Sequence, residues 1–168
     1  MTFHRLRPPA PRRALLAAAT LVASMATLLP ASVRAAPAIN TLKPGLIGGR
    51  GELAIQGYDP VAYFTEARPV KGLDSHAHTW MGATWTFASR EHLELFKAHP
   101  ERYAPQYGGY CAYGTARGYL VKIDPAQFRI VDGKLYLNYD ADVQALWLKD
   151  VPGFIRAADA KYPNLIRE

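Results

Sequence analysis

The sequence predicts a small single domain of the α+β class, in which antiparallel β-hairpins pack against three to four short helices. Runs with the alternation of strands are joined by short turns that contain glycine, as at Asp132-Gly133. Helix-starting residues such as Ser89 and Asp140 precede apolar stripes. Strands and helices do not alternate regularly along the chain, which favours an antiparallel sheet over a parallel one.

Composition places the chain among folded proteins. Of its 168 residues, 49% are hydrophobic and 20% are charged, which suits one domain with its own core. The formal charge is +6, but five arginines and no acidic residue fall in residues 1–35, so 15 Lys and Arg face 14 Asp and Glu in the rest. The excess of positive charge therefore belongs to the leader, and we expect no nucleic-acid partner.

The leader has the parts of an export signal. Residues 1–35 contain arginines near the start, an apolar run over 14–29 and small residues at the end. Arg12-Arg13 resembles the pair of a twin-arginine signal, and an ordinary secretory signal is the alternative. In either case we expect a bacterial protein exported to the periplasm.

The domain boundaries follow from that leader. Cleavage after Ala35 or after Ala38 would leave no membrane span in the mature protein. Residues 36–52 are rich in Gly and Pro without a clear period, which is typical of a linker. We expect the folded domain at 53–165.

Capping residues predict the helices of the first half. Asp59 can accept hydrogen bonds from free amides, and Pro60 suits the first helical position, where its missing N–H costs nothing. Ser89 predicts a second helix over 90–98. Pro100 then ends that helix and can start a short further turn.

Residues 76–88 predict a β-hairpin. Gly82-Ala83 would form its turn, because glycine takes the positive φ, and Trp80 would then lie opposite Trp85. Alternation places one set of side chains on a common face: His76, His78, Trp80, Trp85 and Phe87. His76 and His78 could bind a metal ion together, since side chains two apart on a strand point the same way. The plainer interpretation makes them the polar ends of an aromatic face.

The second half predicts further hairpin and helical elements. Residues 119–123 predict a strand, and 128–139 predict a hairpin around the Asp-Gly turn. Asp140 predicts the start of a helix. A last helix should begin at Pro152 and end before Pro163.

A segment rich in glycine and tyrosine, residues 103–119, holds the only cysteine, Cys111. Tyrosine rings with flexible glycines predict an aromatic-walled loop that could hold a small ligand or a partner protein. The candidate residues for that role are Tyr107, Gly108, Gly109, Tyr110 and Tyr113. A single cysteine cannot close an internal disulfide, so Cys111 is buried and inert, paired between two chains, reactive, or a metal ligand.

Three stretches resemble, in order, the motifs of the YHS-domain family. Residues 59–61, DPV, resemble its opening Asp-Pro-Val-Cys-Gly-Met, and residues 85–89, WTFAS, resemble its Tyr-His-Phe-Cys-Ser segment. Residues 96–103, FKAHPERY, resemble its Phe-x-x-x-Pro-Glu-x-Tyr. The whole of 53–165 is similar to an exported subgroup of this family with a Gly-Tyr-Cys-Ala-Tyr loop.

The resemblance implies a small domain involved in the handling of heavy metals, commonly copper, and often attached to other metal proteins. The family's cysteines fall on Ala62, Ala88 and His92, and the histidine of its name falls on Thr86. Alanine cannot bind a metal ion, so the family's thiolate site is missing and only His92 is left as a donor.

We therefore expect an exported, non-enzymatic binding protein of copper homeostasis, with the metal held by Cys111 and by His92 or His78. Thiolate and imidazole ligands suit Cu(I). One alternative is a module that binds a small ligand or a partner protein without metal. Another is a redox protein using Cys111, which would need a base or a positive environment to lower the pKa of the thiol. A homodimer that pairs Cys111 with a second copy is also open.

Overall fold

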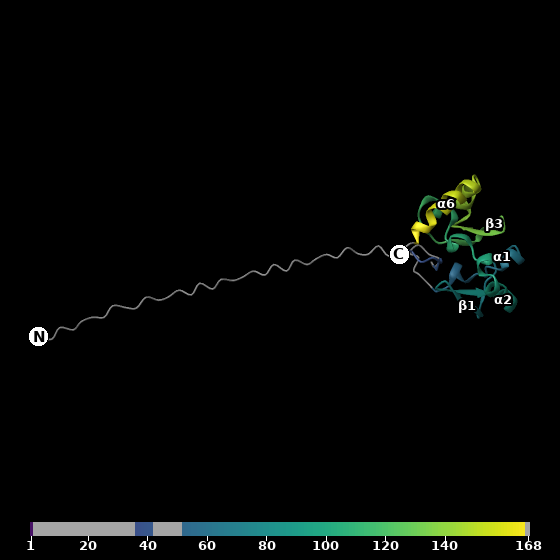
Figure 1. The fold of residues 1–168 in the computed structure, drawn as a ribbon, viewed down its shortest axis with the longest axis horizontal. Coiled ribbons are helices and arrows are strands. Elements are labelled where there is room, and N and C mark those ends of the chain that lie inside the picture. Colours follow the sequence, from purple (N-terminus) through teal and green to yellow (C-terminus); the bar gives the residue numbers. More distant parts are fainter. Residues whose placement is uncertain (2–35, 42–51, 167–168) are drawn as a thin grey trace. The chain divides into compact units, whose positions relative to one another are not determined.

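The computed structural model describes residues 1, 36–41 and 52–166. The compact unit of the chain is Val33–Glu168, and its fold is α+β, as the sequence predicts. Two separate two-stranded antiparallel sheets, β1-β2 and β3-β4, lie in different parts of this unit, with α2 near β1 and α6 near β3 (Figure 1). The predicted export signal falls outside the described residues except for Met1.

The described residues contain more helices than the three to four expected. In chain order the elements are η1 (Ala54–Gly57), α1 (Ala62–Thr65), β1 (Leu73–Trp80), β2 (Ala83–Phe87), α2 (Arg90–Ala98), α3 (Pro100–Tyr103), η2 (Gln106–Gly109), α4 (Ala112–Arg117), β3 (Asp124–Val131), β4 (Lys134–Asn138), α5 (Ala141–Trp147) and α6 (Val151–Leu165). Several of these helices are single turns, too short to show a periodic pattern in the sequence.

The first hairpin forms, but its predicted register is wrong. Met81 and Gly82 make the turn, with φ of 49° and 73°, so the turn lies one residue earlier than expected. Trp85 consequently pairs with His78 and not with Trp80. Positive φ at both central residues is the geometry that matches the twist of a hairpin, and here a methionine adopts it.

The second hairpin confirms its prediction. Val131 pairs with Lys134 across Asp132 and Gly133, whose φ values are 50° and 71°. The strand expected at 119–123 is not formed, and β3 starts only at Asp124.

The predicted caps are confirmed. The Ser89 side chain accepts a hydrogen bond from the backbone N–H of His92 at 3.1 Å, at the start of α2. The Asp140 carboxylate accepts one from Val143 N at 2.8 Å, at the start of α5. These bonds satisfy amides that would otherwise lack a partner at a helix start.

A tertiary contact fixes the C-terminal end of the last helix. α6 runs through Pro163 to Leu165, so the predicted end before Pro163 is wrong. Tyr162 fixes this end, because its ring packs against Tyr107 and its hydroxyl donates to the carbonyl of Ala38 at 2.5 Å. A contact from outside the helix thus outweighs the helix-ending tendency of proline.

The start of the predicted linker packs against the domain. Ile39 and Asn40 are buried, and Asn40 donates from its side chain to the carbonyl of Gly109 at 2.8 Å. The residues 36–41 therefore differ from a free linker.

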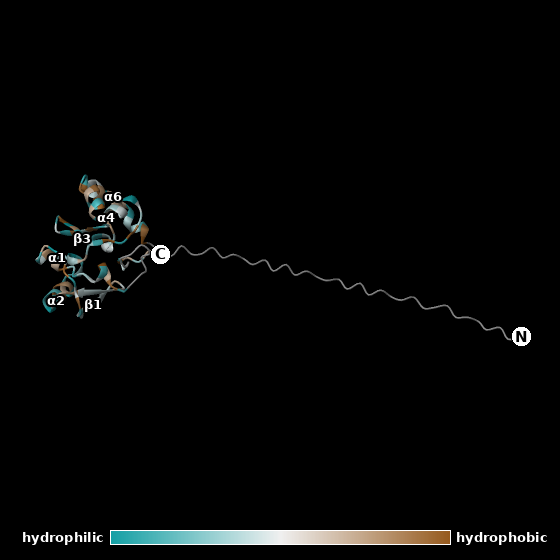
Figure 2. Cartoon of the chain, turned by 180° about the vertical axis from the view of Figure 1, so that it is seen from behind, coloured by the Kyte–Doolittle hydropathy of each residue, from teal (hydrophilic) through white to brown (hydrophobic). Residues whose placement is uncertain are grey.

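Two groups of buried side chains form the core. The larger combines η1, α1, the first hairpin and α2, and its aromatic centre is Phe96, whose ring lies 5.1 Å from those of Trp85 and Phe87. The smaller joins η2, α4, α5 and α6 around Trp147. Apolar and polar residues are interspersed along the helices and strands (Figure 2). No helix among the described residues is long and apolar enough to cross a membrane.

Candidate functional site

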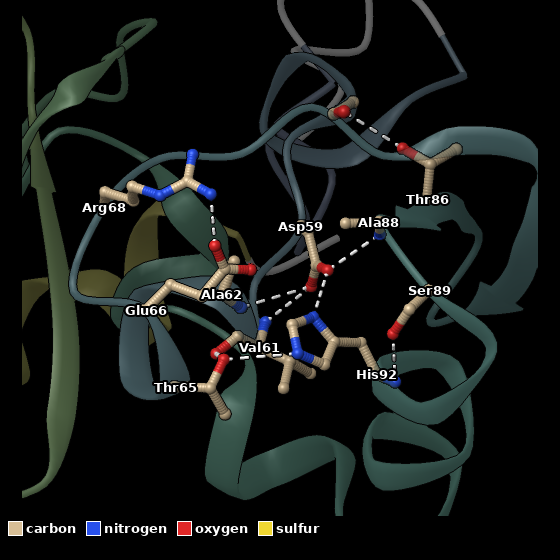
Figure 3. Close-up of polar contacts among 11 residues, drawn as sticks. Asp59, Val61, Ala62, Thr65, Glu66, Arg68, Thr86, Ala88, Ser89 and His92 are labelled. Atoms are coloured by element: carbon tan, nitrogen blue, oxygen red, sulfur yellow. Dashed lines mark hydrogen bonds and ion pairs between the residues drawn. The ribbon is translucent and has the colours of Figure 1, made fainter.

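A buried carboxylate organises the contacts between α1 and the segment that precedes α2 (Figure 3). Asp59 has no exposed surface. Its Oδ1 accepts from the amides of Val61 at 2.8 Å and Ala62 at 3.4 Å, which confirms the predicted cap. Its Oδ2 accepts from the amide of Ala88 at 2.8 Å, next to β2. Asp59 thus joins two segments that are 29 residues apart.

The same carboxylate holds an imidazole. His92 lies in the first turn of α2, and its Nδ1 is 2.6 Å from Asp59 Oδ2. The His92 side chain is 12% exposed. On the other side of the ring, Nε2 lies 3.2 Å from Oγ1 of Thr65, the last residue of α1. Oγ1 of Thr65 also lies 3.2 Å from the carbonyl oxygen of Val61 and donates to it. Both ring nitrogens of His92 therefore have a partner (Figure 3).

Cys111 lies at the start of a helix that the sequence did not predict. It is the N-cap of α4, and its Sγ accepts from Gly114 N at 3.3 Å and donates to Asn138 Oδ1 at 3.8 Å. Burial raises the pKa of the Cys111 thiol, and hydrogen bonds from the amides of Gly114, Tyr139 and Tyr113 oppose that rise. With 1% of its surface exposed, this thiol lacks the lowered pKa and the access that a nucleophile or an interchain disulfide needs.

The tyrosines of the same segment belong to the core. Tyr107 and Tyr110 are buried, and Tyr113 is half-buried. The Tyr107 hydroxyl donates to Asp159 Oδ1 at 2.9 Å, and the Tyr110 hydroxyl donates to the carbonyl of Pro37 at 3.0 Å. A docking surface for a partner protein needs exposed side chains. The burial of these tyrosines therefore argues against the interpretation of this segment as a partner-binding loop.

The glycines of this segment allow close backbone contact. Gly108 has φ of 59°, and a Cβ there would overlap the carbonyl oxygen of Ala38. Gly109 has φ of 81°, and a Cβ there would lie 2.5 Å from Ile55 Cγ2. Their role in the structure is to let residues 36–41 and η1 pack tightly.

His76 and His78 lie on β1, with His76 in the irregular stretch between the paired residues Leu73 and Ala77. Exposed and half-buried residues alternate from 76 to 80, with His76, His78 and Trp80 half-buried. The Trp80 ring packs 5.7 Å from that of Phe96, so this face is the one turned toward α2. Nδ1 of His76 is buried and has no hydrogen-bond partner among the described residues.

The three metal donors proposed from the sequence lie in different networks. The thiol of Cys111 bonds to Asn138 and Gly114, both nitrogens of His92 are engaged with Asp59 and Thr65, and His78 lies on β1. In the part of the chain that the structure describes, no group of three or more His, Cys, Asp or Glu side chains could hold a metal ion. Among the described residues, the hydrogen bonds of the Cys111 thiol are to Asn138 and Gly114 and not to a histidine.

No family model, no curated protein and no solved structure matches this chain.

The sequence pointed to part of this site. Asp59 was expected as a cap and His92 as a donor, but nothing in the sequence linked the two, which are 33 residues apart. Thr65 carried no signal at all. The order of the motifs DPV and WTFAS was the only hint that these segments meet.

Proposed function

We propose that this chain is an exported, non-enzymatic YHS-like binding protein of the periplasm that takes part in transition-metal homeostasis, with copper as its cargo. The leader at 1–35 and the three ordered motifs support the export route and the class of protein. The observation that carries the metal assignment is the pair of imidazoles on β1, His76 and His78. Side chains two apart on one face of a strand can reach a common ion.

His76 and His78 are the two described histidines that share one strand, whereas His99 is exposed at the end of α2. His92 is engaged at both ring nitrogens. His76 keeps a buried Nδ1 without a hydrogen-bond partner in the described residues. We therefore assign the cargo site to His76 and His78, in place of a site shared between Cys111 and a histidine.

The number of available ligands favours Cu(I) over Zn(II) and Cu(II). Zn(II) and Cu(II) prefer about four ligands, which no cluster of the described residues supplies. Cu(I) is soft, binds imidazole and accepts two donors.

Competition for Cu(I) tests the proposal. The exported protein is titrated with Cu(I) against a chelator, together with His76→Gln, His78→Gln, Cys111→Ala and, as matched control, the exposed His99→Gln. We expect either β1 variant to lose more than about tenfold in affinity, or about 1.4 kcal/mol, and the other two to bind like wild type. Wild-type protein that does not compete for Cu(I) would refute the metal function.

The aromatic environment offers a second readout. His78 is paired directly with Trp85, and Trp80 shares its face. Copper bound at this pair should quench tryptophan fluorescence in proportion to occupancy, and His78→Gln should abolish the quenching.

A further inference from the structure

We propose that Thr65 is an activated hydroxyl, and hence a site of covalent acylation by activated esters. The inference does not depend on metal binding at β1. It rests on the order of three side chains, a buried carboxylate, an imidazole and an exposed hydroxyl, joined by contacts of 2.6 Å and 3.2 Å (Figure 3). A nucleophile within hydrogen-bond reach of a base, which is itself oriented by a third group, is the arrangement that activates hydroxyls in acyl transfer.

Asp59 is the positioning residue of this arrangement. Its carboxylate is fully buried and fixed by the amides of Val61, Ala62 and Ala88, so it cannot turn away from the ring. As an acceptor facing Nδ1, it favours the neutral tautomer with the proton on Nδ1. Nε2 of His92 then carries the lone pair that faces Thr65.

Thr65 is placed where a reagent can reach it. It is exposed at the end of α1, whereas His92 is mostly covered. Its hydroxyl donates to the carbonyl of Val61 and lies at the same distance, 3.2 Å, from Nε2 of His92, so a rotation about the Cβ–Oγ1 bond turns the proton to the imidazole. Only the imidazole can accept this proton outright, because a backbone carbonyl is far too weak a base.

The reaction is a simple acyl transfer. Oγ1 of Thr65 attacks the carbonyl carbon of the ester, a new C–O bond forms, and the hydroxyl proton moves to Nε2 of His92. Asp59 stabilises the resulting imidazolium. The bond to the leaving alcohol or phenol then breaks, that group takes the proton from His92 or leaves as its anion, and Thr65 carries the ester. One acyl group is transferred to one side chain, without turnover.

The test uses p-nitrophenyl acetate on the folded exported protein, with the acetylated residues located by peptide mass spectrometry. Thr79 is an internal control in the same sample, because it is exposed on β1 and has no hydrogen bond to a histidine among the residues that the structure describes. We expect Thr65 to be acetylated about 100-fold faster than Thr79, the contribution typical of general-base assistance. Equal rates at the two threonines would overturn the proposal without any variant being made.

Variants separate chemistry from structure. Thr65→Ser should keep the reaction, and Thr65→Val should abolish it. His92→Ala should slow the acetylation of Thr65 about 100-fold, and added imidazole should restore part of the rate, which a purely structural role of His92 would not allow. For Asp59, nitrogen NMR of the His92 ring should find the neutral proton on Nδ1 in wild type and a changed tautomer in Asp59→Asn. A folded His92→Ala with the wild-type rate would refute the role of the imidazole.

Discussion

Replacing Asp59 by alanine should destabilise the fold strongly. The substitution removes four hydrogen bonds from a carboxylate with no exposed surface: to Val61 N, Ala62 N, Ala88 N and His92 Nδ1. Loss of a cap costs about 1 kcal/mol, and each hydrogen bond to a buried carboxylate contributes roughly 1.5–3 kcal/mol. Because bonds that share one carboxylate are not additive, we expect a total loss of about 4 kcal/mol.

That loss is a large part of the free energy of unfolding of an ordinary domain, roughly 5–15 kcal/mol. Urea unfolding followed by tryptophan fluorescence measures it, since Trp85 lies in the same core cluster as the elements that Asp59 joins. Asp74→Ala is the matched control, because Asp74 is exposed on β1 and should change stability by less than about 0.5 kcal/mol. If Asp59→Ala were as mild as Asp74→Ala, Asp59 would not hold these segments together.

Other predictions concern the Gly/Tyr segment. Because burial raises the pKa of Cys111, its neutral thiol stabilises the fold below the pKa of the unfolded thiol, about 8.5, and this contribution is lost as the pH rises further. The free energy of unfolding should therefore fall less steeply above that pH in Cys111→Ala than in wild type, and identical slopes would contradict this. Native Cys111 should react with iodoacetamide much more slowly than the unfolded protein does. Gly108→Ala should cost more than about 2 kcal/mol by overlap with Ala38, whereas Gly133→Ala, with open space around it, should cost only the strain of its positive φ, about 1 kcal/mol. Thermal unfolding of the two variants side by side checks this order.

Local capping chemistry made much of the fold predictable. Ser89 and Asp140 gave the starts of α2 and α5, and Asp132-Gly133 gave the turn of the second hairpin. Each of these signals depends on the hydrogen-bonding or φ preference of residues within four positions of one another. Such preferences can be read from the sequence without knowledge of the tertiary structure.

The sequence did not predict the turns and helices that depend on tertiary contacts. The turn of the first hairpin uses Met81 at positive φ, which no propensity favours. α4 contains Gly114, which weakens a helix by itself, and a Cβ there would lie 3.1 Å from the Tyr119 ring, which is a tight contact. The αL residue Gly118, at φ of 97°, was the one local sign that a helix ended there.

The candidate site was predictable only in its parts. The sequence predicts that His76 and His78 share a face of one strand, and both are half-buried on β1 in the structure. The contact between Asp59 and His92 depends on how α1 packs against the start of α2. The hydrogen bond of Cys111 to Asn138 likewise joins segments that no local pattern relates. Pairings between distant segments are properties of the packed fold.

Copper content of the protein isolated from the cells that naturally produce it tests the central claim most directly, because it assumes nothing about the ligands. Elemental analysis should find stoichiometric copper in wild-type protein purified without added metal. The His76→Gln, His78→Gln double variant, purified in parallel, should contain almost none, and Cys111→Ala should contain as much as wild type. Wild-type protein without copper, or a double variant that keeps its copper, would contradict the account.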